Sequence, residues 1–235
     1  MAGPGVEKKP LEPKQLAWLY MTAKERVIEA GFADEIDWQE EITFADLDET
    51  TFLRESAWVV LSAGFREAMV RRRFREVSRA FFNWSSAELI MTHREICRFN
   101  ALIAFRNQQK IDAILGIVER VAAEGIGTIR KKIENRGIEF IRELPFMGPI
   151  TSCHLAKNLG VVIVKPDRHL TRIAVKTGYK SAERMCRTIA EVVGDSLSVI
   201  DIVIWRYATI TNTYKTDIDA FDSLYPASLN SPALV

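Results

Sequence analysis

A single carboxylate among cations is the first candidate for chemistry in this sequence. Asp167 is followed directly by Arg168, with Lys165 two residues before it and Arg172 five residues after it. A carboxylate beside cations stays ionised, so it can stabilise a developing positive charge and orient or deprotonate a water molecule. Asp167 is therefore the candidate catalytic residue. The alternative is that it only caps a helix beginning at Arg168, because Asp is a favoured N-cap residue.

A predicted helical hairpin precedes this carboxylate. Gly148 lies nineteen residues before Asp167, between two apolar helical segments. Pro145 stops the first helix, Gly148 permits a turn, and Pro149 suits the first turn of the second helix. Free N–H groups at such a helix start can hold a phosphate without reading a base. The expected phosphate contacts are Gly148, Ile150, Thr151, Ser152, Lys157, Lys165, Arg168 and Arg172. A plain hairpin in the core is the alternative.

Charge is unevenly distributed along the chain, although the net charge is only +1. Residues 25–55 hold eleven acidic residues against two arginines, whereas residues 65–79 hold six arginines against two glutamates. Residues 128–187 hold thirteen basic residues against five acidic ones. This asymmetry suggests one face for a polyanion, with solvated helix faces as the simpler explanation.

The elements that must position these residues are almost all helical. Apolar residues recur at helical spacing along most of the chain, and the one strand-like run, residues 161–164, is too short for a sheet. Residues 127–144 are expected to form one helix, and the acidic stretch that includes Trp38 and Phe44 is expected to form a connector. The sequence therefore predicts an all-α fold of about ten short helices.

Composition is that of an ordinary globular protein, with 48% hydrophobic and 27% charged residues. The three cysteines are scattered, and His93, His154 and His169 do not cluster, so neither a disulfide framework nor a metal site is expected. No apolar run reaches the roughly 18 residues of a membrane span, and the first residues lack an apolar signal core. A soluble, cytoplasmic protein is predicted, associated with the nucleoid if the source is bacterial.

Together these features resemble the helix-hairpin-helix DNA glycosylase superfamily, in which a Leu-Pro-Gly-x-Gly hairpin precedes an extended segment ending in a catalytic Asp, often as Val-Asp-x-His. In this sequence the pattern falls on Leu144, Pro145, Gly148, Asp167 and His169. Upstream, "ESAWVVLSAGF" resembles the family's Leu-Leu-Ser-Ala-Gln helix end, and "RNQQKIDAI", with Asn107 and Lys110, resembles its Asn-x-x-Lys-Ala helix start.

The resemblance covers about residues 50–210 and implies a two-lobed bundle with a DNA cleft between the lobes. Residues 13–215 would form the glycosylase domain, with the terminal helices in one lobe and the middle helices in the other. Residues 1–12 would be a flexible N-terminus and residues 216–235 a C-terminal tail.

The nearest branch in sequence character is 3-methyladenine DNA glycosylase I, whose base-recognising Glu opens the helix where Glu55 lies. The zinc ligands of that branch are missing, because the first Cys is Cys97 and the first His is His93. Phe146 replaces the first Gly of the family's hairpin, and Ile150 replaces the Lys of strand-cutting members. No cofactor is expected, apart from a monovalent cation at the hairpin that Phe146 puts in doubt.

The implied activity is that of a monofunctional DNA N-glycosylase, which flips a modified or damaged base out of double-stranded DNA, hydrolyses its N-glycosidic bond and leaves an abasic site. An alkylated purine is the first substrate expected. A bulky modified cytosine of viral DNA, removed by a defence enzyme, is the second. The chain is expected to act as a monomer. Candidates for the base pocket or for the wedge that fills the gap are Glu55, Trp58, Phe65, Trp38 and His169.

Two other functions stay open at this point. One is a non-catalytic helix-hairpin-helix module that only binds DNA. The other is a bifunctional glycosylase-lyase that uses Lys157 or Lys165 as an amine nucleophile.

Overall fold

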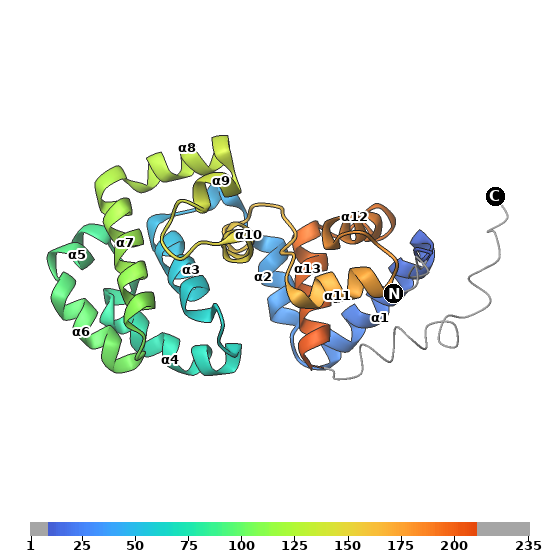
Figure 1. Cartoon of the computed structure of the whole chain (residues 1–235), viewed down its shortest axis with the longest axis horizontal. Coiled ribbons are helices and arrows are strands. Elements are labelled where there is room, and N and C mark those ends of the chain that lie inside the picture. Colours follow the sequence, from blue (N-terminus) through green and yellow to red (C-terminus); the bar gives the residue numbers. More distant parts are fainter. Residues whose placement is uncertain (1–8, 211–235) are drawn as a thin grey trace, which may run out of the picture. The chain divides into compact units, whose positions relative to one another are not determined.

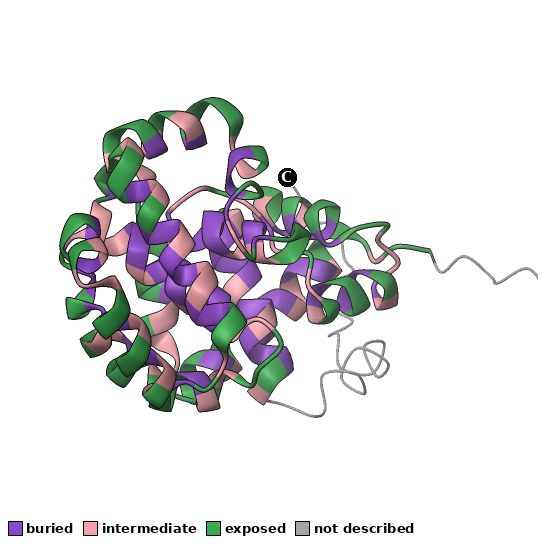
Figure 2. Cartoon of the chain, turned by 60° about the vertical axis from the view of Figure 1, so that its left-hand side comes forward, coloured by how far each residue is buried: buried purple, intermediate pink, exposed green. Residues whose placement is uncertain are grey.

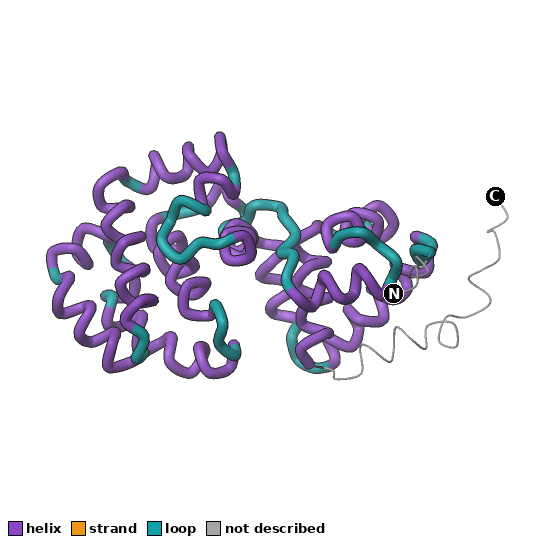
Figure 3. The backbone as a smooth tube through the Cα atoms, viewed as in Figure 1, coloured by secondary structure: helices purple, strands orange, loops and turns teal. Residues whose placement is uncertain are grey.

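The computed structural model describes residues 9–210, and within this range every regular element is a helix (Figures 1 and 3). The predicted all-α class is confirmed, while the tail proposed for residues 216–235 lies outside the described residues. No helix of this range is both long and apolar enough to cross a membrane. The α-helices are α1 Pro13–Glu29, α2 Ala33–Glu41, α3 Glu49–Ser62, α4 Glu67–Ala80, α5 Ala87–Thr92, α6 Arg94–Ala104, α7 Gln108–Glu124, α8 Ile126–Arg136, α9 Ile138–Ile141, α10 Pro149–Asn158, α11 Arg168–Lys176, α12 Ala182–Val193 and α13 Leu197–Ile210. The 3-10 helices are η1 Phe44–Asp46 and η2 Phe82–Trp84.

The chain divides into two compact units. Among the described residues, the middle unit consists of residues 42–161, and the terminal unit combines residues 9–41 with residues 162–210. Helices α3 to α10 belong to the middle unit, whereas α1, α2, α11, α12 and α13 belong to the terminal unit.

The core of the middle unit is built around α3. This helix is buried along most of its length, including Phe52, Ala57 and Val60, as expected for a helix that is apolar on nearly all sides. It packs against α7, α10, α4 and η2. The surrounding helices are amphipathic instead, with buried positions on one side and exposed positions on the other (Figure 2). The hairpin helix α10 is thus held directly by the most buried helix of its unit.

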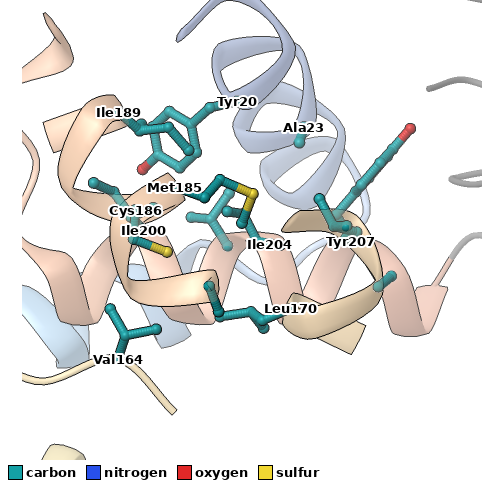
Figure 4. Packing of buried hydrophobic residues seen from close by; sticks show 14 of the residues in the cluster. Tyr20, Ala23, Val164, Leu170, Met185, Cys186, Ile189, Ile200, Ile204 and Tyr207 are labelled. Carbon is teal, nitrogen blue, oxygen red and sulfur yellow. The ribbon is translucent and has the colours of Figure 1, made fainter. Parts of the chain in front are cut away.

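The core of the terminal unit is centred on α13, against which α1, α2, α11 and α12 all pack. Cys186 of α12 lies beside Ile200 of α13 in this cluster, Met185 lies beside Ile204, and Leu170 of α11 belongs to the same cluster (Figure 4). All three of Met185, Cys186 and Ile200 are fully buried. The short helix α11, which begins directly after Asp167, is therefore anchored by its apolar side.

Several helix starts follow from local side-chain chemistry. In each case a polar side chain accepts a hydrogen bond from a backbone N–H of the first turn, which satisfies a donor that the helix itself leaves open. These N-cap residues are Asp48 of α3, Ser86 of α5, Asn107 of α7 and Ser181 of α12.

Two expectations about helices are wrong. The acidic stretch around Trp38 is not a connector but forms α2, because Ile36 enters the core and Glu35 accepts hydrogen bonds from Arg206 of α13. The single helix expected over residues 127–144 is divided into α8 and α9 at Gly137, which has a φ of 53°. A left-handed residue cannot continue a right-handed helix, so the chain turns there.

Gly178 permits a close backbone approach inside the terminal unit. Its φ is +83°, and a Cβ at this position would lie 2.6 Å from Cα of Pro10. The segment that it accommodates is held by Leu11 N–H, which donates to Thr177 O at 3.0 Å.

We expect Gly178→Ala to lower the free energy of unfolding by about 2 kcal/mol or more, since it adds a backbone clash to the usual left-handed strain. Gly194→Ala is the matched control, because Gly194 has a φ of +84° but open space around its Cα. The free energy of unfolding of the control variant should fall by only about 1 kcal/mol. Urea denaturation followed by circular dichroism measures both, and equal losses would contradict the role of the close approach.

Candidate nucleic-acid interface

The hairpin of the middle unit is formed by α9, a turn of seven residues and α10 (Figure 3). The residue with left-handed geometry in this turn is Phe146, with a φ of 68°, and not Gly148, whose φ is −84°. The expectation that Gly148 provides the unusual geometry is therefore wrong. A Cβ on Gly148 would meet only Thr151 Oγ1, at 3.9 Å. The backbone strain, which typically costs about 1–3 kcal/mol, is stored at the aromatic residue.

The first turn of α10 leaves backbone donors open. Gly148 N–H donates to Thr151 Oγ1 at 2.7 Å, so the Thr151 hydroxyl closes the turn. Ser152 N–H bonds back to Gly148 O at 2.9 Å. Within the described residues, the N–H groups of Ile150 and Thr151 have no hydrogen-bond acceptor. Two adjacent open donors at the positive end of a helix dipole form a favourable place for an anion.

Two of the expected phosphate contacts are buried. The Ser152 side chain is fully buried and its hydroxyl donates to Pro149 O at 3.1 Å. The Lys157 side chain is 3% exposed. Both side chains support α10 from inside, so the anion-binding capacity of the hairpin comes from its backbone.

Lys110 connects the hairpin with the loop between α3 and α4. Its Nζ donates to three carbonyl oxygens at the end of α3, namely Val60 O, Leu61 O at 3.3 Å and Ala63 O at 2.8 Å. These are carbonyls that the helix end leaves without intrahelical donors. The side chain is only 3% exposed, and burial lowers the pKa of Lys110 to about 8.

Two aromatic rings cover this buried ammonium group. Lys110 Nζ lies 4.6 Å from the ring centroid of Phe146 and 5.2 Å from that of Phe65, distances typical of cation–π contacts. Phe65 also packs edge-on against Phe105 at 5.4 Å. The structure thus brings the predicted wedge residue and the hairpin together. A sequence signal for this arrangement exists, because Lys110 falls on the apolar side of α7 with Ile114.

The outer surface of this cluster is apolar. Phe65 is 42% exposed, Phe146 is 41% exposed and Ile150 is 40% exposed. Large apolar side chains that remain in solvent beside open backbone donors are a feature of binding surfaces rather than of cores.

Glu55 is buried and joins α3 to the hairpin. Its Oε2 accepts from Asn158 Nδ2 at 2.9 Å, and its Oε1 accepts from Arg54 Nε at 3.0 Å. Burial raises the pKa of Glu55, and the contacts with Arg54 and Asn158 oppose that rise. The carboxylate therefore holds the end of α10 in place.

The two tryptophan candidates lie in different units. Trp58 of α3 is half-buried, with Phe74 edge-on at 5.1 Å and the Arg71 guanidinium over its ring at 5.6 Å. Trp38 lies on α2 of the terminal unit and is 37% exposed. The structure does not place the two indoles in one cluster.

Asp167 is the N-cap of α11 in the terminal unit. Its Oδ1 accepts from His169 N–H at 2.8 Å and from Leu170 N–H at 3.0 Å. Its Oδ2 accepts no hydrogen bond from the described residues, and the side chain is partly exposed. One oxygen thus fixes the carboxylate, and the other is open to a ligand.

Three cations lie close to Asp167 in the sequence of the same unit, namely Lys165, Arg168 and Arg172. Arg168 and Arg172 are exposed and make no ion pair with any described residue. Lys165 N–H donates to Asp201 Oδ2 at 2.6 Å, and the Lys165 ammonium lies 5.8 Å from the ring centroid of Trp205. Burial lowers the pKa of His169, the three cations lower it further, and only Asp167 opposes them. His169 therefore remains a neutral ring near pH 7.

The sequence-predicted residues fall into two groups. The hairpin, Glu55, Trp58 and Phe65 belong to the middle unit, whereas Trp38 and the segment from Lys165 to Arg172 belong to the terminal unit. Among residues 9–210, no three His, Cys, Asp or Glu side chains lie together in a way that could hold a metal ion.

Comparison with protein-family models, with curated proteins and with solved structures finds no match to this chain.

Proposed function

We propose that this protein is a monofunctional DNA N-glycosylase, which binds double-stranded DNA through the hairpin and uses Asp167 to hydrolyse the N-glycosidic bond of a modified base. In this proposal DNA occupies a cleft between two lobes. The observation that carries the proposal is the carboxylate of Asp167, fixed through one oxygen and open at the other.

The hairpin supports DNA binding through three properties. Ile150 and Thr151 offer open N–H groups, Phe146 holds a strained left-handed conformation, and apolar rings stand in solvent beside them. Strained residues of this kind cluster at binding and catalytic sites. Backbone donors grip a phosphate in any sequence context, as an enzyme that searches DNA requires.

The chemistry assigned to Asp167 follows from the reaction. Breaking an N-glycosidic bond builds positive charge on the sugar, and a nearby carboxylate stabilises that charge. The same group can orient the attacking water and accept its proton. With Oδ1 engaged by two N–H groups, Oδ2 is the oxygen available for this role. Arg168 and Arg172 would hold the flanking phosphates.

A base must leave the stack before it can be cleaved, and Phe65 is the side chain proposed to fill the gap. It is exposed, and it lies over Lys110 next to the hairpin. Trp58, in the same unit as the hairpin, is proposed to stack on the flipped base, and Glu55 is proposed to position α10 behind it. An alkylated purine is the first substrate proposed, since its positive charge already weakens the glycosidic bond, and a bulky modified cytosine of viral DNA is the second.

Strand cleavage by an amine of the hairpin is not favoured by the side chains present there, whereas Lys165 is partly exposed and is the amine that borohydride trapping addresses. Ile150 occupies the position where the resembling family's lyases carry Lys, and Lys157 is buried. A non-catalytic DNA-binding module remains the competing function, because capping of α11 alone would account for Asp167.

Mass spectrometry of released bases tests the proposal directly. The full-length protein is incubated with duplexes that contain alkylated, oxidised, deaminated or hypermodified bases, and an unmodified duplex serves as the control. We expect one class of free base to appear, with abasic sites left in uncut strands. Borohydride should trap no covalent adduct. Release of no base from any duplex would contradict the proposal, and a trapped adduct would indicate a lyase.

A further inference from the structure

The arginines of α4 are not equivalent once the helix is folded. Val70 and Val77 are buried against the middle unit, and the arginines project from the other side. Arg71 pairs with Glu67 and covers the Trp58 ring, while Arg73 Nη1 lies 3.5 Å from Glu76 Oε2. Both glutamates of α4 are therefore ion-paired with these two arginines.

Three other arginines of α4 have no acidic partner. Arg72, Arg75 and Arg79 are exposed and make no ion pair with any described residue. Their spacing of three and four residues places them in one row on one face of the helix, about 10 Å long at a rise of about 1.5 Å per residue. Like charges at this spacing repel one another, so the row weakens the free helix slightly. A row of exposed cations without ion pairs among the described residues has the charge and spacing that suit a polyanionic ligand.

The row follows Phe65 in the same stretch of the middle unit. Phe65 is the second residue before α4, and Arg72 and Arg79 follow it by seven and fourteen residues along the same segment. The row itself lies within the helix, and its length of about 10 Å matches about three nucleotide steps of one strand of duplex DNA, which advances about 3.4 Å per nucleotide.

We infer that Arg72, Arg75 and Arg79 form a second contact for the phosphate backbone of duplex DNA, separate from the open N–H groups of the hairpin. The inference rests on the proposed function for the identity of the ligand. The hairpin holds a phosphate through its backbone N–H groups, and the α4 row holds a separate stretch of the phosphate backbone. The row reads no base, because arginines on phosphates confer affinity without sequence preference.

The test is the salt dependence of DNA binding by the full-length protein. Fluorescence anisotropy with a labelled duplex of about 20 base pairs is measured across a series of sodium chloride concentrations. The test variant carries Arg72→Gln, Arg75→Gln and Arg79→Gln together. Because each neutralised phosphate contributes a slope of about −0.9 in log K against log salt, we expect the slope to become shallower by about 2 to 3.

The matched control removes the same charge from ion-paired arginines of the same unit, through Arg94→Gln, Arg98→Gln and Arg136→Gln. These side chains pair with Glu119, Asp112 and Glu143, respectively. We expect the control slope to change by less than about 1. Circular dichroism confirms that both variants are folded.

The salt slope tests the α4 contact, and base release tests the glycosylase activity. An unchanged slope in the test variant, an equal change in both variants, or no salt-dependent duplex binding by the wild-type protein would overturn the inference. Base release with an unchanged slope would overturn it while leaving the proposed chemistry intact. A shallower slope in a protein that releases no base would support the α4 contact and reject the glycosylase activity.

Discussion

Asp167→Asn is expected to abolish base release while leaving DNA binding almost unchanged. Asn caps a helix about as well as Asp, so the N–H groups of His169 and Leu170 keep an acceptor and α11 stays in place. The variant lacks only the negative charge that stabilises the sugar cation and the basicity that activates water. We expect the single-turnover rate to fall by at least about 100-fold, as is typical when a general base is removed.

Ser181→Ala is the matched control for this substitution. Ser181 caps α12 of the same unit through Arg184 N–H at 3.1 Å, so its loss weakens a neighbouring helix start without touching a carboxylate. We expect about 1 kcal/mol less stability and an unchanged rate. Full activity in Asp167→Asn would exclude a catalytic role for the carboxylate, and the N-cap would then account for the residue.

Lys110→Met is expected to produce the largest loss of stability. It removes the donor shared by the carbonyls of Val60, Leu61 and Ala63, and it leaves the buried carbonyls of Val60 and Leu61 without that partner. Unsatisfied buried polar groups are costly, and we expect the free energy of unfolding to fall by about 2–4 kcal/mol. The Phe65 loop should also lose its anchor, which hydrogen exchange at the end of α3 would detect.

The stability of the wild-type protein should also depend on pH through Lys110. Burial lowers the pKa of Lys110 to about 8, whereas the ordinary pKa of a lysine side chain is 10.5. Between these pH values the unfolded protein binds more protons than the folded protein, so this residue makes stability rise with pH. Below pH 8 the cost of burying the ammonium group is present in full, and above pH 10.5 it is gone. The rise reaches at most about 3 kcal/mol.

Lys132→Met separates this effect from the general loss of a lysine. Lys132 of the same unit pairs with Glu124 at 2.9 Å, is partly exposed and also lies over a phenylalanine ring. We expect Lys132→Met to lower the free energy of unfolding by less than about 1 kcal/mol. Its stability should depend on pH as that of the wild-type protein does. Urea denaturation at pH 7 and pH 9.5 measures all three proteins. A Lys110→Met curve parallel to that of the wild type across this range would contradict the assignment.

Features that depend on neighbouring residues in the chain were predictable from the sequence. The all-α class follows from helical spacing of apolar residues, and the starts of α5, α7 and α12 follow from a Ser or Asn one position before the first turn. The position of Asp167 before α11 is also a local property, since its two hydrogen bonds join residues at most three positions apart.

The geometry of the hairpin required the tertiary structure. Sequence assigns the unusual conformation to Gly148, because Gly adopts a positive φ at no steric cost. In the folded chain Phe146 adopts it, with its ring over the Lys110 ammonium group supplied from α7. No pattern within the hairpin contains that cation, which lies 36 residues earlier in the chain.

Burial and pairing of charges were likewise decided by packing. The sequence determined that this chain is helical, that a hairpin precedes Asp167, and that arginines gather at residues 65–79. Only the tertiary structure showed that Lys157 and Glu55 face inward and that α2 is a helix held by Arg206. It also showed which arginines of α4 have no acidic partner among the described residues, namely Arg72, Arg75 and Arg79. Sequence periodicity specifies which side of a helix is polar. The residue that pairs with or buries a charge on that side comes from a distant part of the chain, so only the folded structure reveals it.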